Sequence, residues 1–170
     1  MSAGKLARNG GHVDDFLTLW TIRLACILYF AALLSTGSWR RWTWTAGLVA
    51  YLTHVAAAFA FQHGWSHAAA FRETARRTGE LFSVESGAGL YFNYAFTVVW
   101  LADVVWLWMS GDSYRTRPRW VAVSVHAFMA FMFFNATVVF ASGGVRWLGV
   151  AATAVLLLTH TRARVRPTVQ

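Results

Sequence analysis

Long apolar runs that are nearly free of charge constrain the fold of this chain more than any other feature. The runs cover residues 16–36, 44–62, 90–110, 120–142 and 145–161. A helix needs ~20 such residues to cross the hydrocarbon of a bilayer, and each run reaches or approaches that length. The sequence therefore predicts an all-α protein, a polytopic bundle of about five transmembrane helices in a single integral membrane domain. Gly149 in the last run would let a neighbouring helix approach closely.

The composition also favours a membrane protein over a soluble domain. Hydrophobic residues make up 57% of the chain and charged residues 13%, about half the charged share of an average soluble domain. The single cysteine excludes an intrachain disulfide and a thiolate metal cluster. The net charge of +8 suits segments that face anionic headgroups. We expect lipid as the partner and no nucleic acid, because no basic face alternates with exposed aromatic residues.

The basic residues of the connections favour one orientation. The arginines between the runs at 36–44 and 110–120, and after residue 161, have few acidic neighbours, whereas those of the 63–89 loop alternate with glutamates. By the positive-inside rule, we expect the C-terminus in the cytoplasm and the N-terminus outside, in a bacterial-type inner membrane. The 63–89 segment is then an outer loop, residues 1–15 a polar tail outside, and residues 162–170 a basic tail inside.

Tryptophans near the ends of the runs are expected to anchor the protein at the membrane surfaces. The inner set comprises Trp39, Trp42, Trp44, Trp106, Trp108 and Trp120, and the outer set Trp20, Trp65 and Trp147.

The outer loop has the features of a short helix. Ser66 can cap its start and Gly79 can end it. Two pairs of opposite charge lie four residues apart, Glu73 with Arg77 and Arg76 with Glu80. We expect an amphipathic helix in the outer interface, with an apolar face made by Ala68, Phe71 and Ala75.

Polar residues inside the runs are candidate functional residues, because each costs free energy unless it finds a partner. Asp103 and His126 lie equally far from the turn between the third and fourth runs, so we expect a hydrogen bond or ion pair between them. The pair would fix the register of the helices, carry a proton or hold a ligand. Further polar contacts between helices are expected at Arg23, Asn93 and Asn135, although Arg23 could instead reach the outer headgroups.

His63 and His67 follow directly after the second run. On a continuous helix, residues four apart share a face, so both histidines could bind one divalent metal. Glu73 is expected to point away from that face, so a third ligand would come from another outer segment. The candidates are His12, Asp14, Asp15 and Glu85. Such a metal could activate water or polarise a substrate; the alternative is that the two histidines bind nothing.

A second interpretation uses His54, which is half a turn out of phase with His63. In this interpretation, His54 and His126 face each other inside the bundle and ligate haem b, and the protein carries electrons.

The histidines thus favour a metal- or haem-dependent redox protein of the membrane, and the sequence does not decide whether it is an enzyme. One alternative is a non-catalytic subunit or assembly partner of a larger membrane complex, or a homo-oligomer. Another is a small proton or solute transporter that uses Asp103 and His126.

Overall fold

The structure is a computed structural model that describes residues 3–141, 143, 146–147, 149–151 and 153–154. The chain divides into two compact units, Met1–Thr116 and Arg117–Gln170, each with its own packing. The described residues form helices and no β-strand, as the apolar runs predict.

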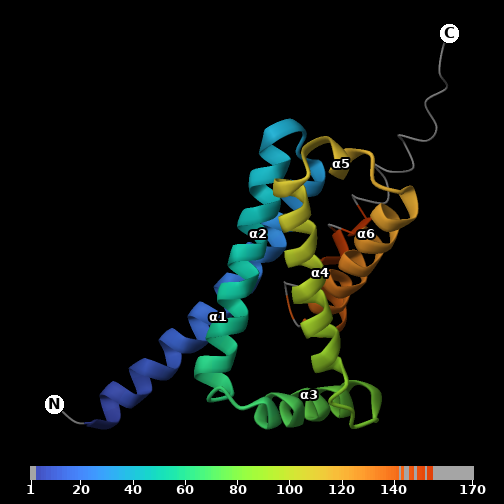
Figure 1. Cartoon of the computed structure of the whole chain (residues 1–170). Helices are drawn as coiled ribbons and strands as arrows, with labels where there is room; N and C mark the ends of the chain where they lie inside the picture. The colour runs from blue at the N-terminus through green and yellow to red at the C-terminus, as the bar shows by residue number, and fades with distance from the viewer. Residues whose placement is uncertain (1–2, 142, 144–145, 148, 152, 155–170) are drawn as a thin grey trace. The chain divides into compact units, whose positions relative to one another are not determined.

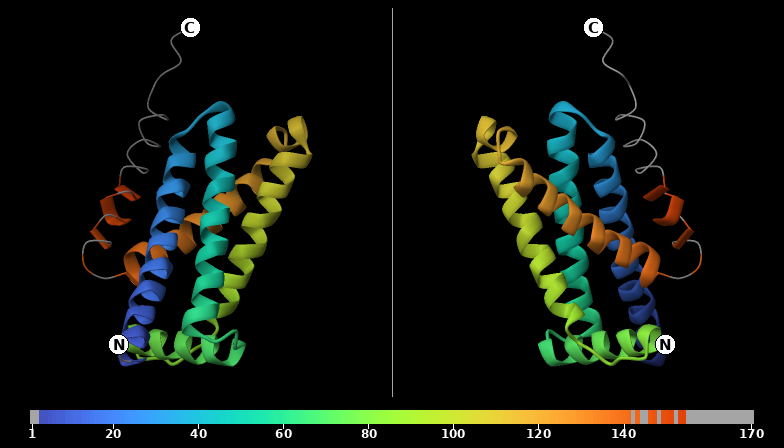
Figure 2. Two further views of the ribbon diagram at one scale, coloured as in Figure 1. Left: turned by 90° about the vertical axis from the view of Figure 1, so that its left-hand side faces the viewer. Right: turned by 90° about the vertical axis from the view of Figure 1, so that its right-hand side faces the viewer.

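The first unit contains three long helices, a shorter helix that crosses the ends of two of them, and the five-residue helix α5 (Gly111–Arg115). Helix α1 (Ala3–Leu34) and helix α2 (Gly37–Ala57) form a hairpin, and α2 continues into a π-helical turn, η1 (Ala58–Gln62). Helix α4 (Gly89–Met109) runs beside α2. Figure 1 and Figure 2 show helix α3 (His67–Phe82) lying across the foot of α2 and α4. It connects the end of η1 to the start of α4.

Four of the described helices are long and apolar enough to cross a membrane, which indicates a membrane protein. They are Phe16–Leu34, Gly37–Gln62, Gly89–Met109 and Arg119–Val139, and they correspond to the first four predicted spans. The predicted span at 145–161 lies largely outside the described residues.

The starts of the first two helices differ from the prediction, because both helices include charged residues that we expected in the connections. The second span begins at Gly37 rather than at residue 44, since Arg40 and Arg41 extend their long side chains from the exposed surface of its first turns. The N-terminal segment that we expected as a polar tail continues α1 back to Ala3. Many of its residues, such as Lys5 and Arg8, are good helix formers.

A cluster of aromatic rings around Trp100 holds the three long helices of the first unit together. Trp100 on α4 is fully buried, and its ring lies 5.3 Å from Trp44 and 5.8 Å from Tyr51 on α2, and 6.4 Å from Tyr29 on α1. Ring pairs at these distances stabilise a fold beyond the area they bury. Gly47 permits this packing, because a Cβ there would lie 3.0 Å from the Trp100 ring.

The expectation that Trp44 anchors the membrane surface is wrong, since its side chain is buried in this cluster and its indole N–H donates to Asp103. Trp39, Trp42 and Trp120 are exposed, as surface anchors are.

The second unit contains helix α6 (Arg119–Phe134) and a π-helical turn, η2 (Asn135–Val139). Pro118 precedes α6, where a proline ring fits the start of a helix. Gly149 lies against η2, because a Cβ there would be 2.7 Å from Thr137. The close approach predicted for Gly149 is therefore confirmed.

Helix α3 is present in the predicted loop, with different bounds and a different packed face. Ser66 caps it by accepting a hydrogen bond from the Ala69 N–H at 3.2 Å. The helix passes Gly79 and ends at Phe82, where Ser83 adopts a left-handed φ of 58°. Ala70 is its buried residue, and Phe71 packs against Gly87.

We predict that Gly87→Ala will loosen the attachment of α3 to the start of α4. A Cβ at Gly87 would lie 2.5 Å from the Phe71 ring, so the ring must move. Overpacking of this kind costs ~1–3 kcal/mol, which should lower the midpoint of thermal unfolding in detergent.

Gly79→Ala is the matched control. Its Cβ would meet only the exposed, flexible Glu85 side chain, and alanine is favoured over glycine inside a helix. An equal loss of stability in both variants would contradict the role given to Gly87.

Candidate functional site

Two unusual turns separate α2 from α3 and decide where His63 lies. In η1 the helix widens, so the His63 N–H donates to the carbonyl oxygen of Ala58, five residues back, at 3.2 Å. Gly64 and Trp65 then adopt positive φ values of 54° and 58°. The chain changes direction there before Ser66 caps α3. Turns of the π type often occur at functional sites.

The structure does not place His63 and His67 on one helical face, because the helix is broken between them. His63 lines a cavity with residues of α3. The Nδ1 atom of His67 instead lies 2.9 Å from the hydroxyl oxygen of Tyr94 on α4, and its ring lies beside those of Phe71 and Tyr91. The two histidines thus have different surroundings.

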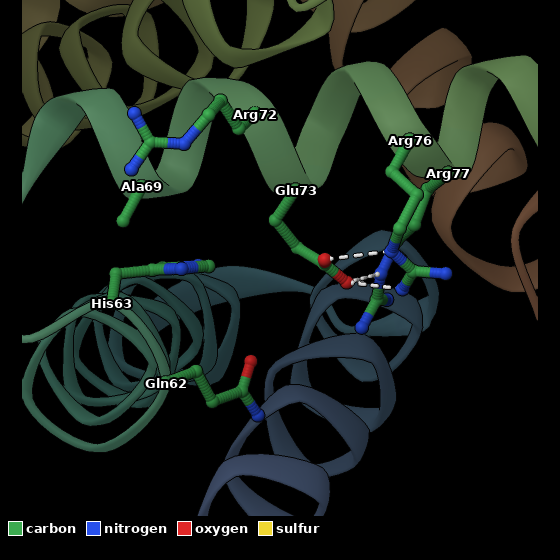
Figure 3. A pocket seen from close by; sticks show the side chains of 7 residues that line it. All are labelled: Gln62, His63, Ala69, Arg72, Glu73, Arg76 and Arg77. Atoms are coloured by element: carbon green, nitrogen blue, oxygen red, sulfur yellow. Dashed lines mark hydrogen bonds and ion pairs between the residues drawn. The ribbon is translucent and has the colours of Figure 1, made fainter.

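We name the first of these surroundings the α3 cavity. It is an open cavity of about 540 Å³ between α3 and the end of η1. Its lining consists of Gln62, His63, Ala69, Arg72, Glu73, Arg76 and Arg77 (Figure 3). The expectation that Glu73 points away from His63 is wrong, because the break in the helix turns this face of α3 toward the end of α2.

Both predicted ion pairs of α3, Glu73 with Arg77 and Arg76 with Glu80, are present, and Arg76 also pairs with Glu73. The Glu73 carboxylate accepts hydrogen bonds from Arg76 at 2.7 Å and 2.9 Å and from Arg77 at 2.8 Å. Arg76 also pairs with Glu80, outside the cavity lining. The hydrogen bonds from Arg76 and Arg77 lower the pKa of Glu73 to about 2, so this carboxylate stays ionised at neutral pH.

Arg72 and His63 form the other part of the cavity. Figure 3 shows Arg72 on the opposite side of Glu73 from Arg76 and Arg77. The Arg72 side chain is exposed, and its guanidinium group makes no hydrogen bond or ion pair with any described residue. Burial lowers the pKa of His63 below its ordinary 6.5; the charge of Glu73 opposes this effect and that of Arg77 adds to it. His63 is therefore neutral at neutral pH.

The charges in the cavity are unbalanced. Three guanidinium groups and one carboxylate line it, and both oxygens of that carboxylate accept hydrogen bonds from arginines. A cation would have to displace these arginines from Glu73. An anion would find Arg72 available, together with the N–H donors of Gln62 and His63.

The metal-binding prediction for His63 and His67 is not supported by a ligand cluster. Within the part of the chain that the structure describes, no group of three or more His, Cys, Asp or Glu side chains could hold a metal. Glu85 is exposed and packs against Gly79. The other candidate ligands, the side chains of His12, Asp14 and Asp15, lie outside the described part.

The intramembrane histidines have one feature in common. The Nδ1 atom of His54 lies 2.8 Å from the carbonyl oxygen of Thr18 on α1, and that of His126 lies 2.9 Å from the carbonyl oxygen of Ala122 on its own helix. Because a carbonyl oxygen only accepts, Nδ1 carries the proton in both rings and Nε2 carries the lone pair. His54 belongs to the first unit and His126 to the second.

Asp103 has partners that the sequence did not reveal. It is 3% exposed, and its Oδ2 atom accepts hydrogen bonds from the Trp44 indole at 3.0 Å and the Tyr114 hydroxyl at 2.8 Å. Tyr114 lies in α5 (Gly111–Arg115), a short helix directly after α4. Pairing of Asp103 with His126 stays a prediction, because these residues belong to different units.

Two of the three other polar candidates have local side-chain contacts. The Arg23 guanidinium lies 5.2 Å from the centroid of the Trp20 ring on the same helix. The Asn135 side chain donates to the carbonyl oxygen of Phe131, also on its own helix, at 2.8 Å. The Asn93 side chain is exposed, and the carbonyl oxygen of Asn93 accepts a hydrogen bond from the Tyr51 hydroxyl on α2 at 3.4 Å. Contacts between helices through these three side chains stay a prediction.

Sequence reasoning did not identify Gln62 and Arg72 as site residues. The available signal was the arginine pattern of α3, because Arg72 and Arg76 lie one helical turn apart.

Comparison of the chain with known protein families, with curated proteins and with solved structures finds no match. The geometry of the site therefore carries the functional argument.

Proposed function

We propose that this membrane protein binds an oxyanion, a phosphate or carboxylate group, in the α3 cavity. The observation that carries the proposal is that three guanidinium groups and only one carboxylate line a single open cavity, which leaves an excess of positive charge there. Guanidinium groups match carboxylate and phosphate oxygens in geometry and charge.

The residues that line the cavity have different roles in binding the anion. Glu73 holds Arg76 and Arg77 in place through its hydrogen bonds, so both guanidinium groups are oriented before a ligand arrives. Arg72 supplies a guanidinium group that no described residue engages. Across the cavity, the Gln62 amide and the His63 ring supply neutral N–H donors.

The position of α3 in the chain supports a site at the membrane surface. One candidate span ends at Gln62, directly before the α3 segment, and the next begins at Gly89, directly after it. Because α3 lies across the ends of both spans (Figure 2), we infer that it lies at the interface, in reach of soluble anions and of lipid headgroups.

The first test is sulfate binding to the purified protein in detergent, measured by isothermal titration calorimetry. Arg72→Gln should weaken binding about tenfold, because a hydrogen bond to a charged group contributes ~1.5–3 kcal/mol and 1.4 kcal/mol corresponds to tenfold. Arg119→Gln is the matched control, since Arg119 is an exposed arginine at the start of α6 that lines no part of the α3 cavity, and it should leave binding unchanged. Equal sulfate affinity in Arg72→Gln and the unmodified protein would falsify the proposal.

The affinity for sulfate should also rise as the pH falls into the mildly acidic range. His63 becomes a cation only below its lowered pKa, and an anion favours that form. Among the other lining residues, Gln62 carries no titratable group, and the pKa of Glu73 is lowered to about 2. Sulfate itself keeps its charge throughout this range. His63→Gln should make the affinity independent of pH, and an unchanged pH profile in this variant would exclude His63 from the site.

A second candidate function is haem ligation by His54. A metal-binding histidine commonly donates its other ring N–H to a backbone carbonyl, which leaves Nε2 for the metal. His54 has this arrangement.

A visible absorption spectrum of the purified protein tests the haem proposal. We expect a Soret band that is lost in His54→Ala, with His67→Ala as a control that leaves the proposed ligand in place. A protein that keeps its helical circular dichroism but has no visible absorption, even after haem is added, would contradict this second function.

A further inference from the structure

At the end of the first unit opposite α3, an arginine stacks on a tryptophan ring. Arg41 lies near the start of α2, and Trp108 lies near the end of α4. The guanidinium carbon of Arg41 sits 3.8 Å from the centroid of the Trp108 ring. At this distance the cation is attracted to the face of the indole. We name this pair the Arg41–Trp108 platform.

Further contacts hold the indole of the platform in place. The Trp108 indole N–H donates to the Thr45 hydroxyl on α2 at 2.9 Å. The Trp42 ring packs edge-on against Trp108, with 4.8 Å between the ring centroids. Three exposed or half-buried residues of α2, Arg41, Trp42 and Thr45, thus engage one side chain of α4. The ring that supports Arg41 is therefore fixed before any ligand binds.

The stack leaves the hydrogen-bonding edge of Arg41 available. A guanidinium group that stacks on a ring keeps its N–H donors in its own plane, where they can form a two-pronged contact with phosphate oxygens. The Arg41 side chain is exposed, and its guanidinium group makes no hydrogen bond or ion pair with any described residue. It differs in this respect from Arg76 and Arg77, which a carboxylate engages.

The surroundings of the platform are those of a membrane surface. Trp39 and Trp42 are 74% and 60% exposed, and tryptophan rings of this kind lie at the level of lipid headgroups. The platform also joins the ends of two candidate spans, Gly37–Gln62 and Gly89–Met109.

From these contacts, we propose that the Arg41–Trp108 platform binds the phosphate group of an anionic phospholipid. The fixed guanidinium edge takes the phosphate oxygens, and the exposed tryptophan rings contact the adjoining glycerol and upper acyl chain. This lipid site is separate from the α3 cavity and does not depend on the function proposed for that cavity.

The test uses the full chain in mild detergent. Phosphatidylglycerol, phosphatidylcholine and inorganic phosphate are titrated separately, and bound lipid is counted by native mass spectrometry. We expect phosphatidylglycerol to bind in preference to phosphatidylcholine, and Arg41→Gln to weaken it about tenfold. Arg41→Lys should restore only part of this affinity, because lysine keeps the charge and loses the planar fork. Arg119→Gln, which changes an exposed arginine at the start of α6 that belongs to neither proposed site, should have no effect on phosphatidylglycerol binding.

Several outcomes would overturn the lipid site. One is equal phosphatidylglycerol binding in Arg41→Gln and the unmodified protein. Another is displacement of the lipid by inorganic phosphate at equal concentration, which would show that the platform takes free phosphate. If Arg41→Gln does not fold, Trp108→Phe serves as the second variant, since it keeps a ring and removes the bond to Thr45. Unchanged lipid affinity in that folded variant would exclude the fixed platform.

Discussion

The packing of Trp100 against α1 and α2 is the interaction on which the first unit depends. In lipid, no hydrophobic force drives helices together, so close packing and hydrogen bonds must hold them. Trp100 supplies the packing, because Gly47 lets its ring reach the backbone of α2 and Tyr29 and Tyr51 surround it. Asp103, one turn further along α4, adds the hydrogen bond from Trp44. Both contacts lie in the middle part of the unit, so they set the spacing of the helix ends where the α3 cavity and the Arg41–Trp108 platform lie.

The α3 cavity exists because the chain leaves α2 in two steps. The π-helical turn η1 widens the end of α2 just before His63, and the left-handed residues Gly64 and Trp65 then turn the chain sideways. Left-handed φ values are unusual for tryptophan, so this turn must be held by its surroundings. Phe59 supplies part of that hold, since its carbonyl oxygen accepts the Trp65 N–H at 2.8 Å. The result is that α3 lies across the bundle and turns its charged face toward the end of α2.

Sequence patterns predicted the features that depend on near neighbours in the chain. The apolar runs predicted the four spans that the described residues contain. Ser66 predicted the start of α3, and the spacing of Glu73 and Arg77 predicted their ion pair. The hydrogen bond between Trp44 and Asp103 joins residues 59 positions apart, and no periodic pattern marks such a contact. The site could not be predicted for a related reason. The interpretation of His63 and His67 assumed a continuous helix, and nothing in the residue types indicated that Trp65, which is not a glycine, would adopt a left-handed conformation.

The two proposed anion sites differ in how the protein holds its arginines, and this difference has consequences for their ligands. In the α3 cavity, Glu73 orients Arg76 and Arg77 and also cancels part of their charge, so binding there depends on Arg72 and responds to the protonation of His63. On the platform, an uncharged indole orients Arg41, so no carboxylate of the described residues cancels its positive charge. An arginine held by a carboxylate is suited to reversible, pH-dependent binding of an anion. An arginine held by a ring between two spans is suited to lasting contact with lipid headgroups, which are always present in a bilayer. The first site is therefore expected to sense its ligand, and the second to anchor the protein.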